Sequence, residues 1–246
     1  MEANFWHERW QSGRIGFHES EGNDRLRRHL GALELPPGAR VFVPPAGKTR
    51  DIGWLLGQGF RVAASELSDL AVAQLFDDLA IRPETTRTGG MTHHAAPGLD
   101  VFAGDFFDLT ADLLGPVDAV YDRAALVALP ADMRPRYAAH LSGMTDTAPQ
   151  VLISFDYPVG TVDGPPFSVD AAEVHRHYAA AYSVLSLERR PAASRAQARS
   201  LKPSGISPLR TSPKLTTQAN PPNTARRFSR FPRPPAGNPS PWRPVP

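Results

Sequence analysis

The chain has 246 residues, of which 41% are hydrophobic and 21% charged, enough for one good-sized domain with a packed core and an appendage. It contains no cysteine, which excludes a disulfide framework, a thiolate metal site and a cysteine nucleophile. No run approaches the roughly 20 apolar residues of a membrane span, and the N-terminus "MEANFWHERW" lacks the apolar stretch of a signal peptide. The composition therefore predicts a cytoplasmic protein without membrane association.

Charge and proline content divide the chain near residue 190. Residues 191–246 hold ten of the 27 Lys and Arg residues, none of the 25 Asp and Glu residues, and 13 of the 26 prolines. The first 190 residues thus carry 17 basic and 25 acidic residues, a net charge of −8. Because the tail has few large apolar residues, it cannot bury enough surface to offset its ordering entropy. We predict a domain at 1–190 and a disordered basic, proline-rich tail at 191–246.

The first half of this domain alternates short apolar runs with helical patterns. The runs "ARVFVPP" (39–45) and "FRVAASE" (60–66) predict buried strands. Residues 49–58 and 69–80 place their apolar side chains at helical spacing. Strand, helix, strand, helix is the pattern of a parallel sheet.

The second half continues with a polar interruption. Residues 83–98, "PETTRTGGMTHHAAPG", are polar and punctuated by Gly and Pro, which predicts a loop or insertion. The remaining predicted elements are a strand and loop at 99–109, a strand running into a helix at 117–129, a helix at 133–144, a strand at 150–158, a helix at 171–181 capped by Asp170, and a strand at 182–190.

The stretch "VPPAGKT" (43–49) ends like the phosphate-binding P-loop, G-x-x-x-x-G-K-[ST]. That pattern needs a glycine five positions before Gly47, where this chain has Phe42. Pro44 and Pro45 also remove backbone N–H groups that a phosphate cradle would use. The sequence therefore argues against a P-loop nucleotidase.

The chain lacks the G-x-G-x-x-G pattern of dinucleotide sites but keeps two of their other features. Gly47 lies at a strand-to-helix turn, where a cofactor can approach the backbone. Glu66 follows 19 positions later at the end of the next predicted strand, where a carboxylate can accept both ribose hydroxyls of an adenosine. The alternative is that Glu66 is only a solvated strand end.

Four blocks of the chain resemble the thiopurine S-methyltransferase family, particularly its bacterial members. They are "FWHERWQSGRIGFHESEGN" (5–23), "VFVPPAGKTRDIGWLLGQGFRVAASELS" (41–68), "VDAVYDRAALVALP" (117–130) and "GPPFSV" (164–169). The resemblance covers about residues 4–190. It implies the α/β fold of class I methyltransferases, a Rossmann-like, doubly wound and mostly parallel sheet. It also implies S-adenosylmethionine as co-substrate and no metal.

The resemblance assigns roles to matching positions of this sequence. Towards the cofactor these are Trp10 as a cover, the backbone around Pro45 beside the methionine portion, Glu66 on the ribose, and Asp105 and Phe106 flanking the adenine. Arg123 would line the reaction centre, touching both cofactor and acceptor and serving as the catalytic residue. Phe17, Pro165 and Pro166 would line the acceptor pocket.

Each assignment has a simpler alternative. Arg123 could only form a salt bridge with Asp122 or another acid, and Trp10 could be a core residue. The Pro165-Pro166 pair could be only a turn. The histidine pairs His93-His94 and His175-x-His177 lack a third ligand of definite spacing, so we predict surface histidines and no metal site.

Two departures from the family pattern stand out. The family loop usually reads Val-Pro-Leu-Cys-Gly-Lys-Ser, whereas this chain has Pro45 and Ala46 at its centre. Nothing in 191–246 resembles the family's closing helix and antiparallel strand, so we predict that the last strand or strands are missing. The abrupt change to Arg, Pro and Ser suggests translation in another reading frame of a GC-rich gene.

The resemblance predicts a monomeric enzyme that methylates a soft sulfur, selenium or tellurium atom of a small acceptor, such as a thiol, a thiopurine or a metalloid species. Metalloid detoxification is its expected role. One alternative is an impaired or inactive cofactor-binding protein with an altered C-terminus. Another is a binding module that acts through its basic tail, although we expect no specific nucleic-acid partner.

Overall fold

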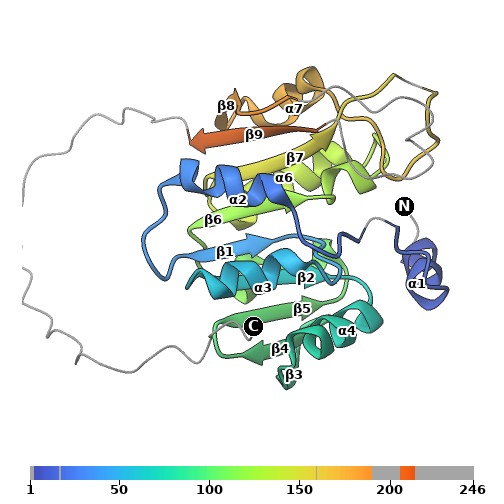
Figure 1. Cartoon of the computed structure of the whole chain (residues 1–246), viewed down its shortest axis with the longest axis vertical. Helices are drawn as coiled ribbons and strands as arrows, with labels where there is room; N and C mark the ends of the chain where they lie inside the picture. Colours follow the sequence, from blue (N-terminus) through green and yellow to red (C-terminus); the bar gives the residue numbers. More distant parts are fainter. Residues whose placement is uncertain (1–2, 17, 159, 190–205, 214–246) are drawn as a thin grey trace, which may run out of the picture.

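The computed structural model describes residues 3–16, 18–158, 160–189 and 206–213, whose strands form one sheet of order β3-β4-β5-β2-β1-β6-β7-β9-β8 (Figure 1). Its centre is parallel and comprises β5 (Leu99–Ala103), β2 (Arg61–Glu66), β1 (Arg40–Val43), β6 (Ala119–Arg123) and β7 (Gln150–Phe155). The chain winds outward from β1 in one direction and from β6 in the other. The carboxyl ends of β1 and β6 therefore flank the topological switch point, where ligands of such sheets bind.

Helices cover both faces of this sheet. On one face lie α2 (Asp24–His29), α3 (Arg50–Gly57) and α4 (Asp69–Leu79), which pack Leu26, Ile52 and Val72 into one apolar cluster (Figure 1). On the other face, α5 (Ala111–Leu114), α6 (Arg134–Met144) and α7 (Ala171–Tyr178) contribute Leu114, Leu141 and Val174 to a second cluster. Strand β1 sends Val41 and Val43 to the first cluster and Phe42 to the second, because successive strand residues face opposite sides.

Most predicted elements are confirmed, with short adjustments at their ends. Thr49 and Ser68 cap α3 and α4 by accepting the N–H groups of Asp51 and Ala71, so Lys48-Thr49 leads into a helix as expected. Three short 3-10 helices follow α2, β5 and β6 at Leu30–Leu33, Phe106–Asp108 and Leu126–Ala128. Helix α1 (Ala3–Gln11) lies near α4 at the edge of the molecule (Figure 1).

Of the two predictions for 83–98, a loop or an insertion, the loop is wrong. Strands β3 (Glu84–Thr88) and β4 (Met91–Ala96) form an antiparallel hairpin that extends the sheet beyond β5. The turn is Gly89-Gly90, and Gly89 has a φ of 61°, which suits a residue without Cβ. The threonine-rich flanks tolerate the pleated backbone although they lack an apolar alternation.

The prediction that the last strand is missing is also wrong. Residues Ile206–Pro213 form β9, which pairs antiparallel with β7 on one side and with β8 (Tyr182–Ser186) on the other. Strand pairing uses backbone N–H and C=O groups, so a segment without an apolar period can still close the edge of β7. The rest of the predicted tail, 191–205 and 214–246, lies outside the described residues.

Candidate active site

The loop between β1 and α3 is fastened to the end of β2. The N–H of Ala46 donates to the carbonyl oxygen of Ser65 at 2.8 Å. The N–H of Gly47 donates to the Glu66 carboxylate (Oε2) at 2.7 Å. Gly47 has a φ of +55°. The ends of β1 and β2 are thereby joined at one side of the switch point, once through backbone groups and once through the Glu66 side chain.

Glu66 is the central acceptor of this half of the site. Its side chain is 6% exposed, and its second oxygen (Oε1) accepts the N–H of Ser68 at 2.9 Å. Burial raises the pKa of Glu66, while the backbone N–H groups of Ser68, Gly47 and Leu67 oppose that rise. A carboxylate offers about four lone-pair positions, so these three N–H groups leave one for a ligand. A fixed carboxylate of this kind can accept a ribose hydroxyl.

Trp10 on α1 covers the same turn. Its indole is 4% exposed, and a Cβ built on Gly47 would lie 3.1 Å from the ring atom Cζ2. The predicted cover is thus in contact with the predicted cofactor loop. Trp10 is also buried, as its packing alternative requires, and its role as a cover for the cofactor stays a prediction.

The end of β5 lies next to Glu66. The N–H of Gly104 donates to the backbone oxygen of Glu66 at 2.9 Å, which brings the following residue, Asp105, close to the same edge. The Asp105 carboxylate is exposed and accepts the N–H of Phe107 at 2.9 Å. Phe106 differs, because its ring is buried against Tyr137 with ring centroids 4.9 Å apart. Any contact of Phe106 with a ligand would therefore use its backbone or one ring edge.

Arg123 closes the other side of the switch point, at the end of β6. Its guanidinium (Nη2) forms an ion pair with the Glu19 carboxylate (Oε1) at 3.0 Å. The alternative reading, a salt bridge with Asp122 or another acid, is therefore met by Glu19. Asp122 itself is fully buried and accepts the hydroxyl of Tyr137 at 2.8 Å. Burial raises the pKa of Asp122 to about 6, while hydrogen bonds from the Tyr137 side chain and from the backbone of Leu126 and Ala125 act to lower it.

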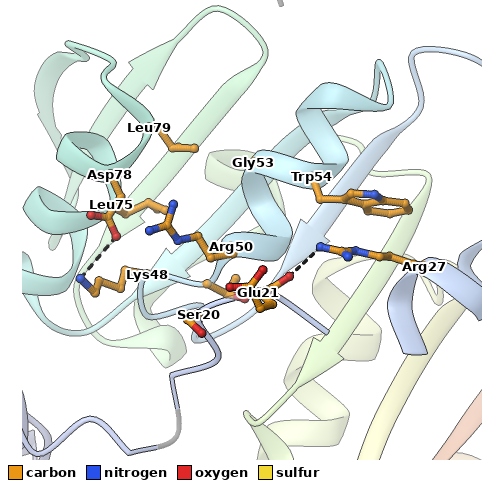
Figure 2. A pocket seen from close by; sticks show the side chains of 11 residues that line it. Ser20, Glu21, Arg27, Lys48, Arg50, Gly53, Trp54, Leu75, Asp78 and Leu79 are labelled. Carbon is orange, nitrogen blue, oxygen red and sulfur yellow. Dashed lines mark hydrogen bonds and ion pairs between the residues drawn. The ribbon is translucent and has the colours of Figure 1, made fainter. Parts of the chain in front are cut away.

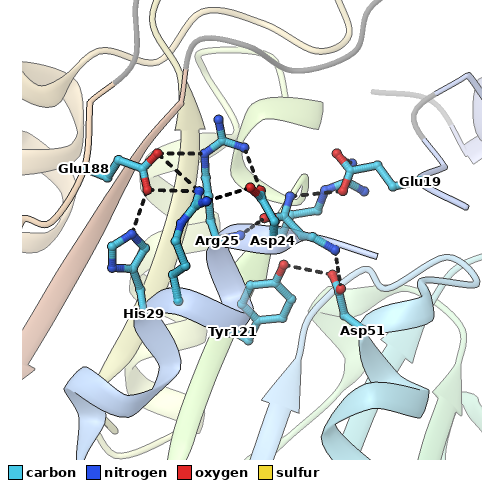
Figure 3. Close-up of polar contacts among 10 residues, drawn as sticks. Glu19, Asp24, Arg25, His29, Asp51, Tyr121 and Glu188 are labelled. Carbon is cyan, nitrogen blue, oxygen red and sulfur yellow. Dashed lines mark hydrogen bonds and ion pairs between the residues drawn. The ribbon is translucent and has the colours of Figure 1, made fainter. Parts of the chain in front are cut away.

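Sequence reasoning missed Glu19 and the polar chain behind it (Figure 3). The second oxygen of Glu19 accepts the side-chain amide of Asn23 at 3.0 Å, and the backbone N–H of Asn23 donates to buried Asp51 at 2.6 Å. The Tyr121 hydroxyl donates to the same Asp51 carboxylate at 2.9 Å. Glu188, which follows β8, contacts His29 at 2.8 Å at the far end of α2 (Figure 3). Apart from the Glu19–Asn23 contact, which spans four positions, these contacts join distant segments, so no local motif predicts them.

The loop at Pro165-Pro166 is held beside the segment that follows Arg123. The N–H of Phe167 donates to the carbonyl oxygen of Val127 at 2.6 Å, and the Tyr157 hydroxyl donates to that of Pro166 at 2.5 Å. The loop is therefore a fixed edge near the end of β6. Phe17, the other predicted acceptor residue, lies outside the described residues.

A separate hollow of about 290 Å³ lies between α3, α4 and residues 20–27 (Figure 2). It is lined by Ser20, Glu21, Arg27, Lys48, Thr49, Arg50, Gly53, Trp54, Leu75, Asp78 and Leu79. Lys48 pairs with Asp78 at 3.3 Å, and Arg27 donates to the backbone oxygen of Glu21 at 2.6 Å. Two of its cations are thus engaged within its own wall, and it shares no residue with the predicted site.

The histidine pairs make ordinary side-chain contacts. His93 contacts Asp100 at 2.9 Å, and His177 contacts Glu173 at 3.3 Å. Across the described part of the chain, no three His, Asp or Glu side chains gather as metal ligands would. Within the same residues, no helix combines the length and apolar character needed to cross a membrane.

Comparisons with known proteins fit this geometry. The profile of the thiopurine S-methyltransferase (TPMT) family matches residues 1–217, which reaches beyond the predicted limit of 190. The thiopurine S-methyltransferase of Xanthobacter autotrophicus is 57% identical over 192 residues, covering 78% of this chain and 90% of that protein. The thiopurine S-methyltransferase of Gluconobacter oxydans is 49% identical over 188 residues, covering 76% and 86%.

Solved structures support the predicted class I methyltransferase fold. A TehB-like SAM-dependent methyltransferase from Corynebacterium glutamicum matches with a TM-score of 0.52 at 16% identity, over 86% of this chain and 98% of that chain. A Burkholderia thailandensis 1,6-didemethyltoxoflavin-N1-methyltransferase with bound S-adenosylhomocysteine matches with a TM-score of 0.55 at 18% identity, over 85% and 84%. At these identities the likeness establishes the fold.

Proposed function

Because the chain belongs to the thiopurine S-methyltransferase family and is a methyltransferase, we propose that it transfers a methyl group from S-adenosylmethionine to a soft sulfur, selenium or tellurium nucleophile. The observation that carries this proposal is the hydrogen bond from the Gly47 N–H to the Glu66 carboxylate, beside the ring of Trp10. At the switch point of the sheet, this arrangement lets a ligand come close to the loop backbone, and it supplies a fixed carboxylate and an apolar cover.

On the cofactor side, each residue would hold a different part of S-adenosylmethionine. Glu66 would accept a ribose hydroxyl, and the backbone from Pro45 to Gly47 would face the methionine portion. Asp105 and Phe106 would flank the adenine, while Trp10 would exclude water from above. The bond from Ala46 to Ser65 supports a working loop despite the unusual Pro45-Ala46 pair.

On the acceptor side, alignment is the main contribution of the chain. When bound, S-adenosylmethionine supplies an electrophilic methyl group on a sulfonium. Arg123 would hold an anionic acceptor in line with that methyl, since its guanidinium stays charged at any working pH. Phe17, Pro165 and Pro166 would form the walls beside a planar acceptor. A soft anion needs little further activation, so no metal is part of the proposal.

We further propose a cytoplasmic monomer that detoxifies selenium or tellurium species and accepts thiopurines as well. The impaired-protein alternative loses its main support, because β9 occupies the place of the strand thought to be missing. The catalytic unit then consists of residues 1–190 together with β9.

Calorimetry with purified protein tests the proposal first. We expect S-adenosylhomocysteine to bind with a dissociation constant on the order of micromolar, at the low end of the usual range of KM values. A screen with an aryl thiol, a thiopurine, selenite and tellurite then identifies the acceptor by methylated product. A folded protein that binds neither S-adenosylmethionine nor S-adenosylhomocysteine would contradict the proposal.

A further inference from the structure

Glu19 and Arg123 form the one ion pair, among those of the described residues, that involves the predicted reaction centre. The pair is sheltered, with side-chain exposures of 11% for Arg123 and 21% for Glu19. Arg123 belongs to a sheet strand, whereas Glu19 belongs to the segment between α1 and α2. The carboxylate can therefore move aside without disturbing the sheet, while the guanidinium stays in place.

Glu19 is also held in its resting position. One of its oxygens faces Arg123, and the other accepts the amide of Asn23 at 3.0 Å. Asn23 is itself 1% exposed and fixed to Asp51 through its backbone N–H at 2.6 Å. The carboxylate thus stays near Arg123 rather than sampling solvent, which makes it an effective competitor for that cation.

We infer that Glu19 determines the charge selectivity of the acceptor site, as the resting counter-ion that an anionic acceptor must displace from Arg123. The inference rests on the proposed function and names its substrate class: acceptors that bind as anions and leave as neutral products. A sheltered cation attracts any anion strongly, and a resident carboxylate lowers that attraction to a level that permits turnover.

The charge balance of the reaction gives this exchange a direction. A lone pair of the acceptor thiolate forms the new bond to the methyl carbon, while the carbon–sulfonium bond breaks and its electron pair stays on the departing sulfur. The thiolate becomes a neutral thioether, so Arg123 loses its anion when product forms. Glu19 then returns to Arg123, which favours release of the product.

The same balance predicts how removal of the Glu19 charge divides between KM and kcat. The acceptor is more negative in the bound ground state than in the transition state, where its charge is already partly neutralised. An Arg123 without its carboxylate would hold the ground state more tightly, which lowers KM without raising kcat. A merely structural role for Glu19 would instead raise KM or loosen the fold.

The test compares Glu19→Gln with wild type, using a nitro-substituted aryl thiol above its pKa as acceptor. We expect KM to fall about two- to fivefold, the size of a measured ion pair of about 0.2–1 kcal/mol, with an equal or lower kcat. Competitive inhibition by an aryl carboxylate should strengthen by a similar factor, whereas its carboxamide should bind as before. Glu19→Asp keeps the charge and should keep the wild-type discrimination between the two inhibitors.

Glu21→Gln is the matched control, because it removes the same charge from an exposed side chain of the same segment. An unchanged or higher KM for the thiolate in Glu19→Gln, or equal shifts for carboxylate and carboxamide, overturns the inference. S-adenosylhomocysteine binding by wild type distinguishes a failure of the inference about Glu19 from a failure of the proposed function. If wild type binds it and methylates the thiol, only the inference fails; if it does neither, the proposed function fails as well.

Discussion

The two halves of the candidate site are built from different interactions. On the cofactor side, backbone groups of neighbouring strand ends meet the Glu66 carboxylate, through Gly47 at 2.7 Å and Ser68 at 2.9 Å. On the acceptor side, a charged pair from distant segments, Arg123 and Glu19, closes the site at 3.0 Å. One half depends on the sheet itself, the other on a side chain of the N-terminal segment.

This difference explains which half is open to change. Backbone hydrogen bonds at strand ends follow from the βαβ connection, so most side chains nearby can vary without losing them. An ion pair depends on both partners, and a single substitution alters its charge. We therefore expect variants of the first half to change cofactor affinity, and variants of the second half to change acceptor kinetics.

Glu66→Ala should have the largest effect on the cofactor half. The substitution removes the proposed ribose acceptor and leaves the N–H groups of Gly47 and Ser68 without their carboxylate partner. We expect S-adenosylhomocysteine affinity to fall at least about a hundredfold, since losing charged hydrogen bonds costs about 1.5–3 kcal/mol each. Calorimetry measures it, with Glu84→Ala on exposed β3 as the control. Unchanged affinity would place the ribose elsewhere.

Arg123→Gln should have the largest effect on the acceptor half. We expect kcat/KM for an anionic acceptor to fall about a hundredfold, because the charge that holds and aligns the acceptor is lost. S-adenosylhomocysteine affinity should fall by a smaller factor, about tenfold at most, because Arg123 is also predicted to touch the cofactor. Arg176→Gln, on the exposed side of α7, controls for net charge. A loss of cofactor affinity as large as the loss of kcat/KM would show that Arg123 serves both halves of the site, and would contradict the division between them.

Asp122 connects the acceptor half to the stability of the domain. Burial raises its pKa from 3.8 to about 6, so the folded state binds its proton more tightly than the unfolded state. Stability contributed by this protonation is present below about pH 4 and is lost as the pH rises through 6. As the pH rises from 4 to 7.5, the free energy of unfolding of Asp122→Asn should therefore increase by about 2–3 kcal/mol relative to that of wild type. Urea unfolding at both pH values measures the gain; a pH-independent difference would contradict it.

Much of the cofactor half could be predicted from the sequence. The strand-to-helix turn at Gly47 and the acid 19 positions later at Glu66 are local signals of a βαβ unit. The 83–98 hairpin and β9 were missed, because backbone pairing can proceed without an apolar alternation. A Gly-Gly turn between threonine-rich flanks was the available signal for the hairpin.

The acceptor half was harder to predict, for a physical reason. Arg123 came from a family block, but its partner Glu19 lies in another block with no spacing rule between them. The buried pair of Asp51 and Tyr121 has the same character, since a polar residue beside a helix start looks solvent-facing in sequence. Such contacts depend on tertiary packing, which periodicity does not encode.

Gly47→Ala should give the smallest effect and separates geometry from chemistry in the cofactor half. The glycine has a φ of +55°, and an added Cβ would lie 3.1 Å from the Trp10 ring. Strain of about 1 kcal/mol together with a displaced indole should weaken S-adenosylhomocysteine binding about tenfold. Gly57→Ala is the matched control, because its Cβ would meet nothing within 4 Å.

A double-substitution cycle with Trp10→Ala resolves the two causes of that loss. If the close approach to the indole matters, Gly47→Ala should weaken binding less in the Trp10→Ala background than in wild type, leaving only the backbone strain. Equal losses in both backgrounds would assign the whole effect to the backbone. In that case Trp10 covers the loop without constraining it, and the cofactor half would depend on the loop backbone and the Glu66 carboxylate rather than on the indole.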